Sequence, residues 1–156
     1  VGGSIYSRFG FSDVLTMFLA LNASVELYKG GVVPLAEYAQ RPYDRDILVR
    51  VLVPKENARF VYQSVRNSQT DFPVLTCAAA KLADGSIRAA IGARPGKAVL
   101  YTAAPEAGET AEEFAARFAA EVKADIKTES NLRGGAEYRR HLAGVLTKRA
   151  VCRLEG

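Results

Sequence analysis

The sequence predicts an α+β protein in which an antiparallel sheet packs against helices. Four strand-like segments follow one another between residues 59 and 102, and two amphipathic helical segments come after them. Strands that are grouped before helices, rather than alternating with them, are typical of an antiparallel sheet with helices on one face. The chain of 156 residues is 49% hydrophobic and 24% charged, which is the composition of a folded globular protein.

The first third of the chain predicts a helix, two strands and a short helical turn between them. These segments are residues 12–22, 24–28, 34–38 and 47–53. Ser12 is a good N-cap, and apolar residues recur after it at helical spacing. The last of the segments is rich in β-branched residues, and its polar Arg50 is expected to face outward. Pro54 ends it, and polar residues follow, so residues 54–57 predict a boundary.

The strands of the second part are predicted at residues 59–65, 74–82, 87–92 and 98–102. Asp84-Gly85 joins the second of these strands to the third, and this pair suits a type I′ hairpin turn. The glycine-containing segment 92–97 is one residue too short for a nucleotide-binding P-loop, and Ala98 stands where that motif has Ser or Thr. We therefore expect an ordinary loop there.

Two helices are predicted to end the chain. The first begins at a capping box formed by Thr110 and Glu113, and its apolar stripe contains Phe114, Phe118, Val122 and Ile126. The second covers about 135–153, and its predicted buried residues are Tyr138, Leu142, Val145, Leu146 and Cys152. Both cysteines, Cys77 and Cys152, are expected to be buried thiols in a reducing cytoplasm.

The net charge of +4 comes entirely from the end of the chain. Residues 1–125 contain 14 basic and 14 acidic side chains, whereas residues 126–156 contain 7 basic and 3 acidic ones. A basic helix of this kind can dock on an acidic partner as readily as on phosphate. The alternative function is therefore a non-enzymatic interaction module that docks a partner through its basic C-terminal helix. We do not expect nucleic-acid binding, because no base-reading module accompanies the helix.

The residue inventory argues against catalysis by side chains and against a metal site. His141 is the only histidine, so it is the only candidate base for a Ser-His-Asp or a Cys-His arrangement. It lies in an arginine-rich helical pattern, where surface or interface packing is the expected role. Two distant cysteines and one histidine do not have the spacing of metal ligands. No apolar run approaches the length of a membrane span. Any redox chemistry would therefore come from a bound cofactor.

The segment from Gly2 to Asp13 places glycines, hydroxyls and one carboxylate in front of the first long predicted helix. Glycine lets the backbone approach a ligand closely, and backbone N–H groups before a helix bind phosphate. Taken by itself, Gly-Gly before a helix is more often an ordinary turn. The chain opens with Val1, directly before this segment, so we expect it to be a fragment, a processed chain or one piece of a longer subunit.

Three segments resemble the FAD subunits of molybdenum hydroxylases, the xanthine dehydrogenase and carbon monoxide dehydrogenase flavoprotein family. Gly2-Gly3-Ser4-Ile5, followed after a spacer by Ser12-Asp13, is similar to the second flavin-binding loop of that family. Segment 46–54 resembles the strand before its C-terminal domain, and segment 136–146, with its Tyr-Arg-Arg sequence, resembles the closing helix. The three matches are collinear over essentially the whole chain.

The resemblance implies a partial FAD-binding lobe at residues 1–55 and a flavoprotein C-terminal domain at residues 56–156. It implies a cytoplasmic oxidoreductase subunit of the xanthine dehydrogenase type, inactive as an isolated fragment. Electrons would pass from a molybdopterin-binding subunit through the [2Fe-2S] clusters of an iron–sulfur subunit to FAD. From FAD they would pass to NAD or another acceptor. The cofactor-binding residues that it implies are Gly2, Gly3, Ser4, Ser7, Asp13, Leu48 and Tyr62.

Two departures from the family pattern affect this expectation. Tyr62 stands where some relatives have a lysine near the flavin ring, so the position lacks a positive charge. The first of the family's two glycine-rich flavin loops does not occur in these residues. We therefore expect the chain alone to bind FAD weakly or not at all, and residues 1–10 to be mobile or rearranged without the opposing loop.

Overall fold

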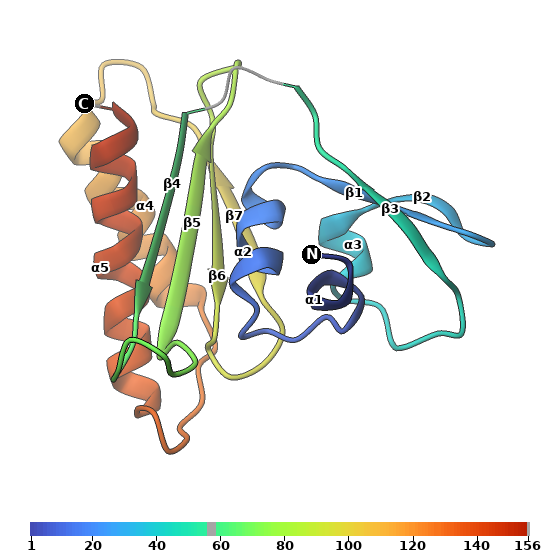
Figure 1. Cartoon of the computed structure of the whole chain (residues 1–156). Helices are drawn as coiled ribbons and strands as arrows, with labels where there is room; N and C mark the ends of the chain where they lie inside the picture. Colours follow the sequence, from blue (N-terminus) through green and yellow to red (C-terminus); the bar gives the residue numbers. More distant parts are fainter. Residues whose placement is uncertain (56–58, 156) are drawn as a thin grey trace.

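The computed structural model describes residues 1–55 and 59–155, and Figure 1 shows how their elements are arranged. The first part forms a small unit around the three-stranded antiparallel sheet β2-β1-β3. Its elements are α1 (Gly2–Tyr6), α2 (Asp13–Ala20), β1 (Ser24–Leu27), β2 (Gly31–Pro34), α3 (Leu35–Tyr38) and β3 (Leu48–Leu52). Arg50 points outward and pairs with Glu26 on β1, as the alternation of β3 predicts.

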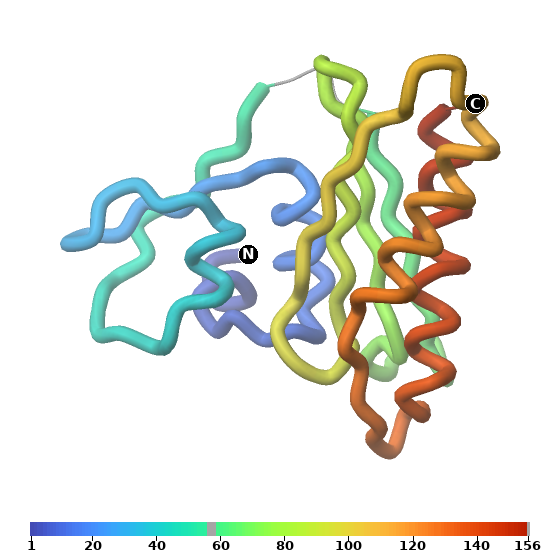
Figure 2. The backbone as a smooth tube through the Cα atoms, turned by 180° about the vertical axis from the view of Figure 1, so that it is seen from behind, coloured from blue at the N-terminus to red at the C-terminus, as the bar shows by residue number. Residues whose placement is uncertain are grey.

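The second part is a four-stranded antiparallel sheet followed by two long helices. The strands are β4 (Arg59–Val65), β5 (Leu75–Lys81), β6 (Ile87–Gly92) and β7 (Val99–Ala103), and they lie in sequence order. The helices are α4 (Ala111–Asp125) and α5 (Ala136–Glu155), which lie side by side on one face of the sheet (Figures 1 and 2). This arrangement confirms the α+β class and the antiparallel sheet.

The central strands β5 and β6 are buried on both faces, and each face of the sheet belongs to a different core. Facing α4 and α5, Cys77 and Ile91 join a cluster that contains Phe114 and Phe118. Facing the first part of the chain, Ala78 and Ala90 join the second cluster, which contains residues of α2 and β1. The sequence predicted the helices on the first face, but it did not predict that α2 covers the second.

Small residues allow α2 to approach the sheet closely. A Cβ at Gly92 would lie 2.4 Å from Oγ1 of Thr16 and 2.5 Å from Oγ1 of Thr76. The two threonine hydroxyls form a buried hydrogen bond of 3.2 Å between α2 and β5. A bulkier residue at position 92 would therefore separate α2 from the sheet.

Several local predictions are confirmed. Thr110 and Glu113 form the capping box of α4, and all four apolar residues of its predicted stripe are buried. Ser12 caps α2 by accepting a hydrogen bond from the backbone N–H of Leu15. Segment 92–97 connects β6 to β7 as a loop.

Other predictions are wrong or lie outside the described residues. The glycine motif, expected to be a loop in front of the first helix, instead contains the helix α1, in which Ile5 is fully buried. The hairpin at Asp84 is not of type I′, because that turn requires φ > 0 at two residues and only Gly85 has it. Tyr138 and Cys152 are exposed, because they lie on the side of α5 that faces away from the sheet. The predicted boundary at 54–57 runs into residues 56–58, which lie outside the described part of the chain.

Candidate functional site

A groove of about 470 Å³ runs between α1 and the start of β3. It is lined by Gly2, Gly3, Tyr6, Asp46, Ile47 and Leu48. Three of these residues, Gly2, Gly3 and Leu48, are among the cofactor-binding residues implied by the family resemblance. The fold thus brings together residues that are separated by more than forty positions in the sequence.

The glycines leave the backbone of α1 open to the groove. An added Cβ at Gly2 or Gly3 would meet no atom within 4 Å, so packing within the chain does not require glycine at either position. The first helical hydrogen bond of α1 runs from the Ile5 N–H to the Val1 carbonyl, so the N–H groups of Gly2, Gly3 and Ser4 have no acceptor within the helix, and no side chain caps α1. Open space beside unpaired backbone donors is what a phosphate-bearing ligand requires.

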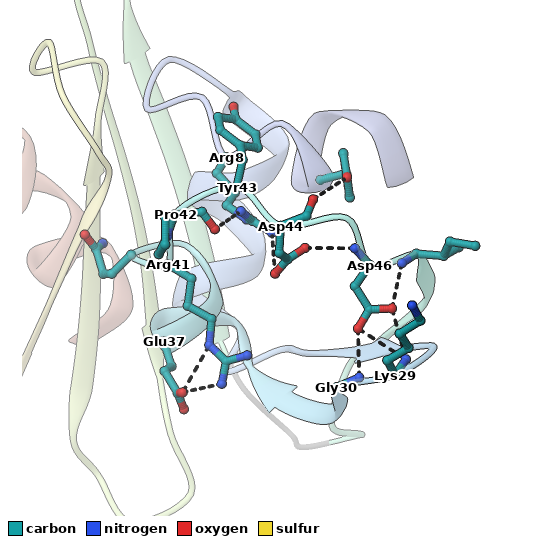
Figure 3. Close-up of polar contacts among 12 residues, drawn as sticks. Arg8, Lys29, Gly30, Glu37, Arg41, Pro42, Tyr43, Asp44 and Asp46 are labelled. Atoms are coloured by element: carbon teal, nitrogen blue, oxygen red, sulfur yellow. Dashed lines mark hydrogen bonds and ion pairs between the residues drawn. The ribbon is translucent and has the colours of Figure 1, made fainter.

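Residues 41–47, which we call the strap, hold α1 against β3. Tyr43 donates its hydroxyl to the carbonyl oxygen of Ser7, and Tyr6 donates to the carbonyl of Asp44 at 3.3 Å. Figure 3 shows Arg8 beside the strap, where its Nη1 donates to the carbonyl of Pro42 at 2.6 Å. The strap thus holds Tyr6 of α1 near Asp46 and Ile47, and all three residues line the groove.

Arg8 is the buried centre of the strap contacts. Its guanidinium carbon lies 4.0 Å from the ring centre of Tyr38 and 5.2 Å from that of Tyr43. Its Nη2 lies 3.6 Å from Asp44, which supplies the opposite charge. Burial between aromatic faces with one carboxylate nearby stabilises the cation without exposing it. Arg8 also adopts the left-handed conformation, with φ of +51°, which turns the chain from α1 toward α2.

Asp46 lines the groove but uses its carboxylate to hold a neighbouring turn. The two oxygens accept hydrogen bonds from the backbone N–H groups of Lys29, Gly30 and Ile47, at 2.7–3.2 Å. The bond from the Lys29 N–H is the largest cause that lowers the pKa of Asp46 below its ordinary value. Asp46 therefore fixes the β1–β2 turn beside the strap (Figure 3).

Ser4 and Ser7 lie on α1 and at its end, but neither lines the groove. The Ser7 hydroxyl donates to the carbonyl oxygen of Ser4 at 3.4 Å, and the Ser7 carbonyl accepts from Tyr43. Ser7 therefore ends α1 and accepts a hydrogen bond from Tyr43 of the strap. Ser4 is half-buried, and its backbone N–H lies next to those of Gly2 and Gly3.

Asp13 and Tyr62 form a separate polar cluster with Arg66. Tyr62 donates its hydroxyl to Oδ1 of Asp13 at 2.5 Å, and Arg66 Nη2 donates to Oδ2 at 2.6 Å. Burial, with the hydrogen bond to Asp13 next in size, raises the pKa of Tyr62 above its ordinary value. This cluster joins the start of α2 to β4. Neither Asp13 nor Tyr62 lines the groove with Gly2 and Leu48.

Sequence reasoning missed Tyr6, Asp46 and Ile47 as groove residues, and it missed the strap altogether. The signal for Tyr6 lay within the glycine motif itself, two residues after Ser4. The signal for the strap was its composition, since one tyrosine and three charged residues stand between Pro42 and Ile47. Such side chains can form tertiary hydrogen bonds and ion pairs.

The part of the chain that the structure describes offers no site for a metal and no helix for a membrane. No group of three His, Cys, Asp or Glu side chains in residues 1–55 and 59–155 could hold a metal ion. None of the described helices is both long enough and apolar enough to cross a bilayer. Cys77 and Cys152 are both free thiols.

The fold and the groove define an α+β protein with a glycine-lined groove beside a small sheet. The model of the CO dehydrogenase flavoprotein C-terminal domain matches residues 60–154. Because this match covers more than half of the chain, the chain belongs to that family. A search of curated protein sequences finds no match.

Solved structures with the same fold include those of three oxidoreductases. Carbon monoxide dehydrogenase from Hydrogenophaga pseudoflava, in a form lacking the Mo-pyranopterin moiety, is 23% identical to this chain, with a TM-score of 0.81. The match covers 98% of this chain and 59% of that one. Reconstituted CO dehydrogenase from Oligotropha carboxidovorans is 21% identical, with a TM-score of 0.81, and 99% of this chain covers 60% of that one. Quinoline 2-oxidoreductase from Pseudomonas putida 86 is 19% identical, with a TM-score of 0.78 and coverages of 99% and 59%. The chain therefore spans about three fifths of the length of these structures.

Proposed function

We propose that this chain is part of the FAD-binding, electron-transferring subunit of a molybdenum hydroxylase. Its membership of the CO dehydrogenase flavoprotein family supports this function. The single structural observation that carries the proposal is the groove in which Gly2, Gly3 and Leu48 meet. That groove joins the glycine motif to a β3 residue, as expected if both contact one elongated cofactor.

The residues of the groove fit a dinucleotide such as FAD. The backbone N–H groups of Gly2, Gly3 and Ser4 would donate to the pyrophosphate, and nothing in the chain fills the space beside the two glycines. Leu48 and Tyr6 offer an apolar and an aromatic surface for a ring system. When bound, FAD would supply the ability to accept and release electrons, while these residues bind and orient it.

Asp13 and Tyr62 have a less direct role in this proposal. Because each is hydrogen-bonded to the other, Tyr62 positions the Asp13 carboxylate, and Arg66 balances its charge. Asp13 retains lone pairs that could accept a hydrogen bond from a ribose hydroxyl. Ser7 would act by holding the end of α1 in place.

The finer parts of the proposal concern the complete assembly. The subunit would receive electrons from molybdopterin and [2Fe-2S] centres on partner subunits and deliver them to NAD or another acceptor, as in enzymes of the xanthine dehydrogenase type. A cytoplasmic location belongs to the same proposal. Co-purification with a molybdopterin-binding subunit and an iron–sulfur subunit tests the assembly, and purification without either would contradict it.

FAD titration of the complete subunit with Gly3→Val tests the groove directly. The substitution meets no atom of the chain but places a side chain in the groove, so it should abolish FAD binding while leaving the fold intact. Gly135→Val is the matched control, because a Cβ at Gly135 also meets nothing within 4 Å and lies outside the groove. FAD binding that is equal in both variants would show that the groove is not the cofactor site. The 156-residue chain alone is expected to bind FAD weakly or not at all.

A further inference from the structure

A second groove runs along the outer face of the helix pair α4 and α5. These helices lie on the side of the sheet away from the first part of the chain (Figures 1 and 2). One end of the groove has a volume of about 200 Å³ and the other about 320 Å³, and the two ends share Val145 and Lys148. The two hollows therefore adjoin each other, and together they extend along about three turns of α5.

Small side chains form the floor of this groove. Gly144 lies where α5 comes close to α4, because a Cβ there would be 3.3 Å from Cβ of Lys123. The other floor residues are Ala119, Ala120, Val145 and Cys152. This floor is apolar and continues to the exposed thiol of Cys152. It can therefore bury an apolar stripe of a partner.

Cations form the rim of the groove, and the chain does not neutralise most of them. Lys123, Arg149 and Arg153 form no ion pair with any carboxylate of residues 1–55 and 59–155. Lys148 has one contact of 3.9 Å, to Glu112, whose side chain is 84% exposed. No acidic residue lines either end of the groove.

Several cations elsewhere on the chain do have a carboxylate partner. Arg41, Arg50, Arg66 and Arg133 each form an ion pair of 2.5–2.7 Å with a carboxylate of the same chain. The rim of the helix groove thus concentrates positive charge that the described part of the chain leaves without a counterpart. An acidic partner would supply it.

We propose that the α4–α5 groove binds an acidic amphipathic helix of a partner protein. The apolar stripe of that helix would lie on the floor between Ala120 and Val145, and its carboxylates would pair with Lys148, Arg149 and Arg153. Residues 141–153 of α5 span about 18 Å at the helical rise, which accommodates three turns of a partner helix. This is the helix-in-groove mode of recognition, with charges on the rim that set orientation.

The lining of the groove favours a protein over a nucleic acid. A phosphate backbone would pair with the rim but would leave the apolar floor uncovered. Single-stranded nucleic acid is bound by stacking of successive bases on several aromatic side chains, and His141 is the one aromatic ring among the residues that line the described parts of this groove. Nucleic-acid binding is accordingly the competing outcome of the test.

Fluorescence anisotropy with a synthetic probe tests the proposal on the 156-residue chain. The probe is an 18-residue helical peptide with leucine and alanine along one face and glutamate on the others. We expect saturable binding that weakens with salt, since the rim pairs are exposed. The double substitution Lys148→Glu with Arg149→Glu should weaken binding about tenfold or more, because two exposed attractions become repulsions. Lys55→Glu with Arg59→Glu is the matched control, since it makes the same change of charge on another surface.

Three results would overturn the proposal. One is equal binding of a peptide with the same composition whose scrambled order removes the apolar stripe. Another is equal binding to the Lys148→Glu, Arg149→Glu variant and to its control. The third is binding of an oligonucleotide at concentrations where the peptide does not bind.

Cys152 provides a second readout that locates the binding site. Its thiol is exposed in the groove, whereas Cys77 is fully buried, and burial raises the pKa of the Cys77 thiol to about 12. A maleimide should therefore modify Cys152 selectively. The acidic peptide should slow this modification, and the peptide with lysine in place of glutamate should not. Unchanged modification in the presence of saturating acidic peptide would place the peptide elsewhere and contradict the proposal.

Discussion

The two faces of the β4–β7 sheet are packed in different ways. On the face that carries α4 and α5, large side chains such as Phe114, Phe118 and Ile91 fill the space between sheet and helices. On the face that carries α2, the sheet contributes mainly alanines and Gly92, so that α2 lies close to the backbone of the strands. Packing on the first face is stabilised by a large buried apolar area, and we call this cluster the thick core. Packing on the second face is stabilised by the close approach of α2 to the strands, and we call it the close-packed face.

This difference matters for the proposed cofactor groove. The groove belongs to the part of the chain that docks through the small-residue face, while α4 and α5 make up the other layer. Polar contacts supplement the thin packing on the α2 side, namely the Thr16–Thr76 hydrogen bond and the Asp13–Arg66 ion pair. The orientation of α1 and α2 should therefore be sensitive to changes of single atoms, which the thick apolar core would tolerate better.

The largest expected effect is that of Phe114→Ala on the thick core. Phe114 is fully buried and stacks on Phe118 with ring centres 5.9 Å apart. Its truncation should lower the free energy of unfolding by about 3–5 kcal/mol, because apolar contacts are lost and a cavity remains. Chemical denaturation measures this loss. The control is Val49→Ala, at a side chain that is 51% exposed, which should change stability by less than about 0.5 kcal/mol.

The next effect is that of Gly92→Ala on the close-packed face. The added methyl group would lie 2.4 Å from the Thr16 hydroxyl oxygen and 2.9 Å from the Gly10 carbonyl oxygen, so α2 must move. We expect a loss of about 1–3 kcal/mol in denaturation experiments. Combining it with Thr16→Ala should recover part of the loss, because one of the obstructing atoms is removed.

Gly135→Ala is the control for that experiment, since a Cβ at Gly135 meets nothing within 4 Å. Equal effects of the two glycine substitutions would show that α2 is not held by close approach. A larger loss for Gly92→Ala than for Phe114→Ala would reverse the comparison between the two faces.

The third effect concerns the polar tie of α2 to β4 at high pH. The pKa of Tyr62 is raised by burial and by its hydrogen bond to Asp13, so its neutral form is favoured in the folded state. This contribution to stability is complete below the ordinary tyrosine pKa of 10.0 and is lost as pH rises above it. Tyr62→Phe should therefore flatten the decline of unfolding free energy above pH 10, by up to about 1.4 kcal/mol per pH unit for one proton.

Asp13→Asn should flatten the same decline to a smaller extent, because it removes the charge that opposes ionisation but leaves Tyr62 buried. The pH dependence of urea denaturation between pH 9 and 12 provides the measurement. Identical slopes for the original chain and Tyr62→Phe would contradict the assignment of this pKa shift to the folded state.

The sequence predicted the thick-core half of the fold well, because the pattern there is periodic. Phe114, Phe118 and Val122 recur at helical spacing, and the capping box at Thr110 marks where the helix begins. The close-packed face gave no such signal, since an alanine in a strand does not indicate which element will cover it. That α2 packs there depends on Gly92 and Thr76, whose roles appear only when the two elements are brought together.

The candidate site was predictable only in part, for a related reason. The spacing of Gly2 and Gly3 relative to Asp13 indicated a ligand-binding segment, but nothing local indicated that Leu48 would lie across a groove from them. The five-residue helix α1 was not predicted, because two glycines disfavour a helix. In the folded chain, the burial of Ile5 and the contacts with the strap stabilise α1. Tertiary contacts over more than thirty residues decide this site, and local patterns do not report them.

The smallest effect tests a polar cluster that lies wholly on the thick-core side. Glu109 accepts hydrogen bonds from Arg117 at 2.9 Å, and these bonds lower the pKa of its carboxyl to about 2. A depressed pKa in the folded state contributes stability above the ordinary value of 4.5, and the contribution is lost as pH falls from 4.5 to about 2. Glu109→Gln should therefore flatten the acid limb of the stability profile between pH 4.5 and 2, and Arg117→Gln should flatten it similarly. Because this cluster only joins the start of α4 to its own preceding loop, neither variant should alter the alkaline slope assigned to Tyr62. An acid limb that is unchanged in Glu109→Gln would show that the Arg117 contact does not persist in solution, and a changed alkaline slope would show that the two faces of the sheet are coupled.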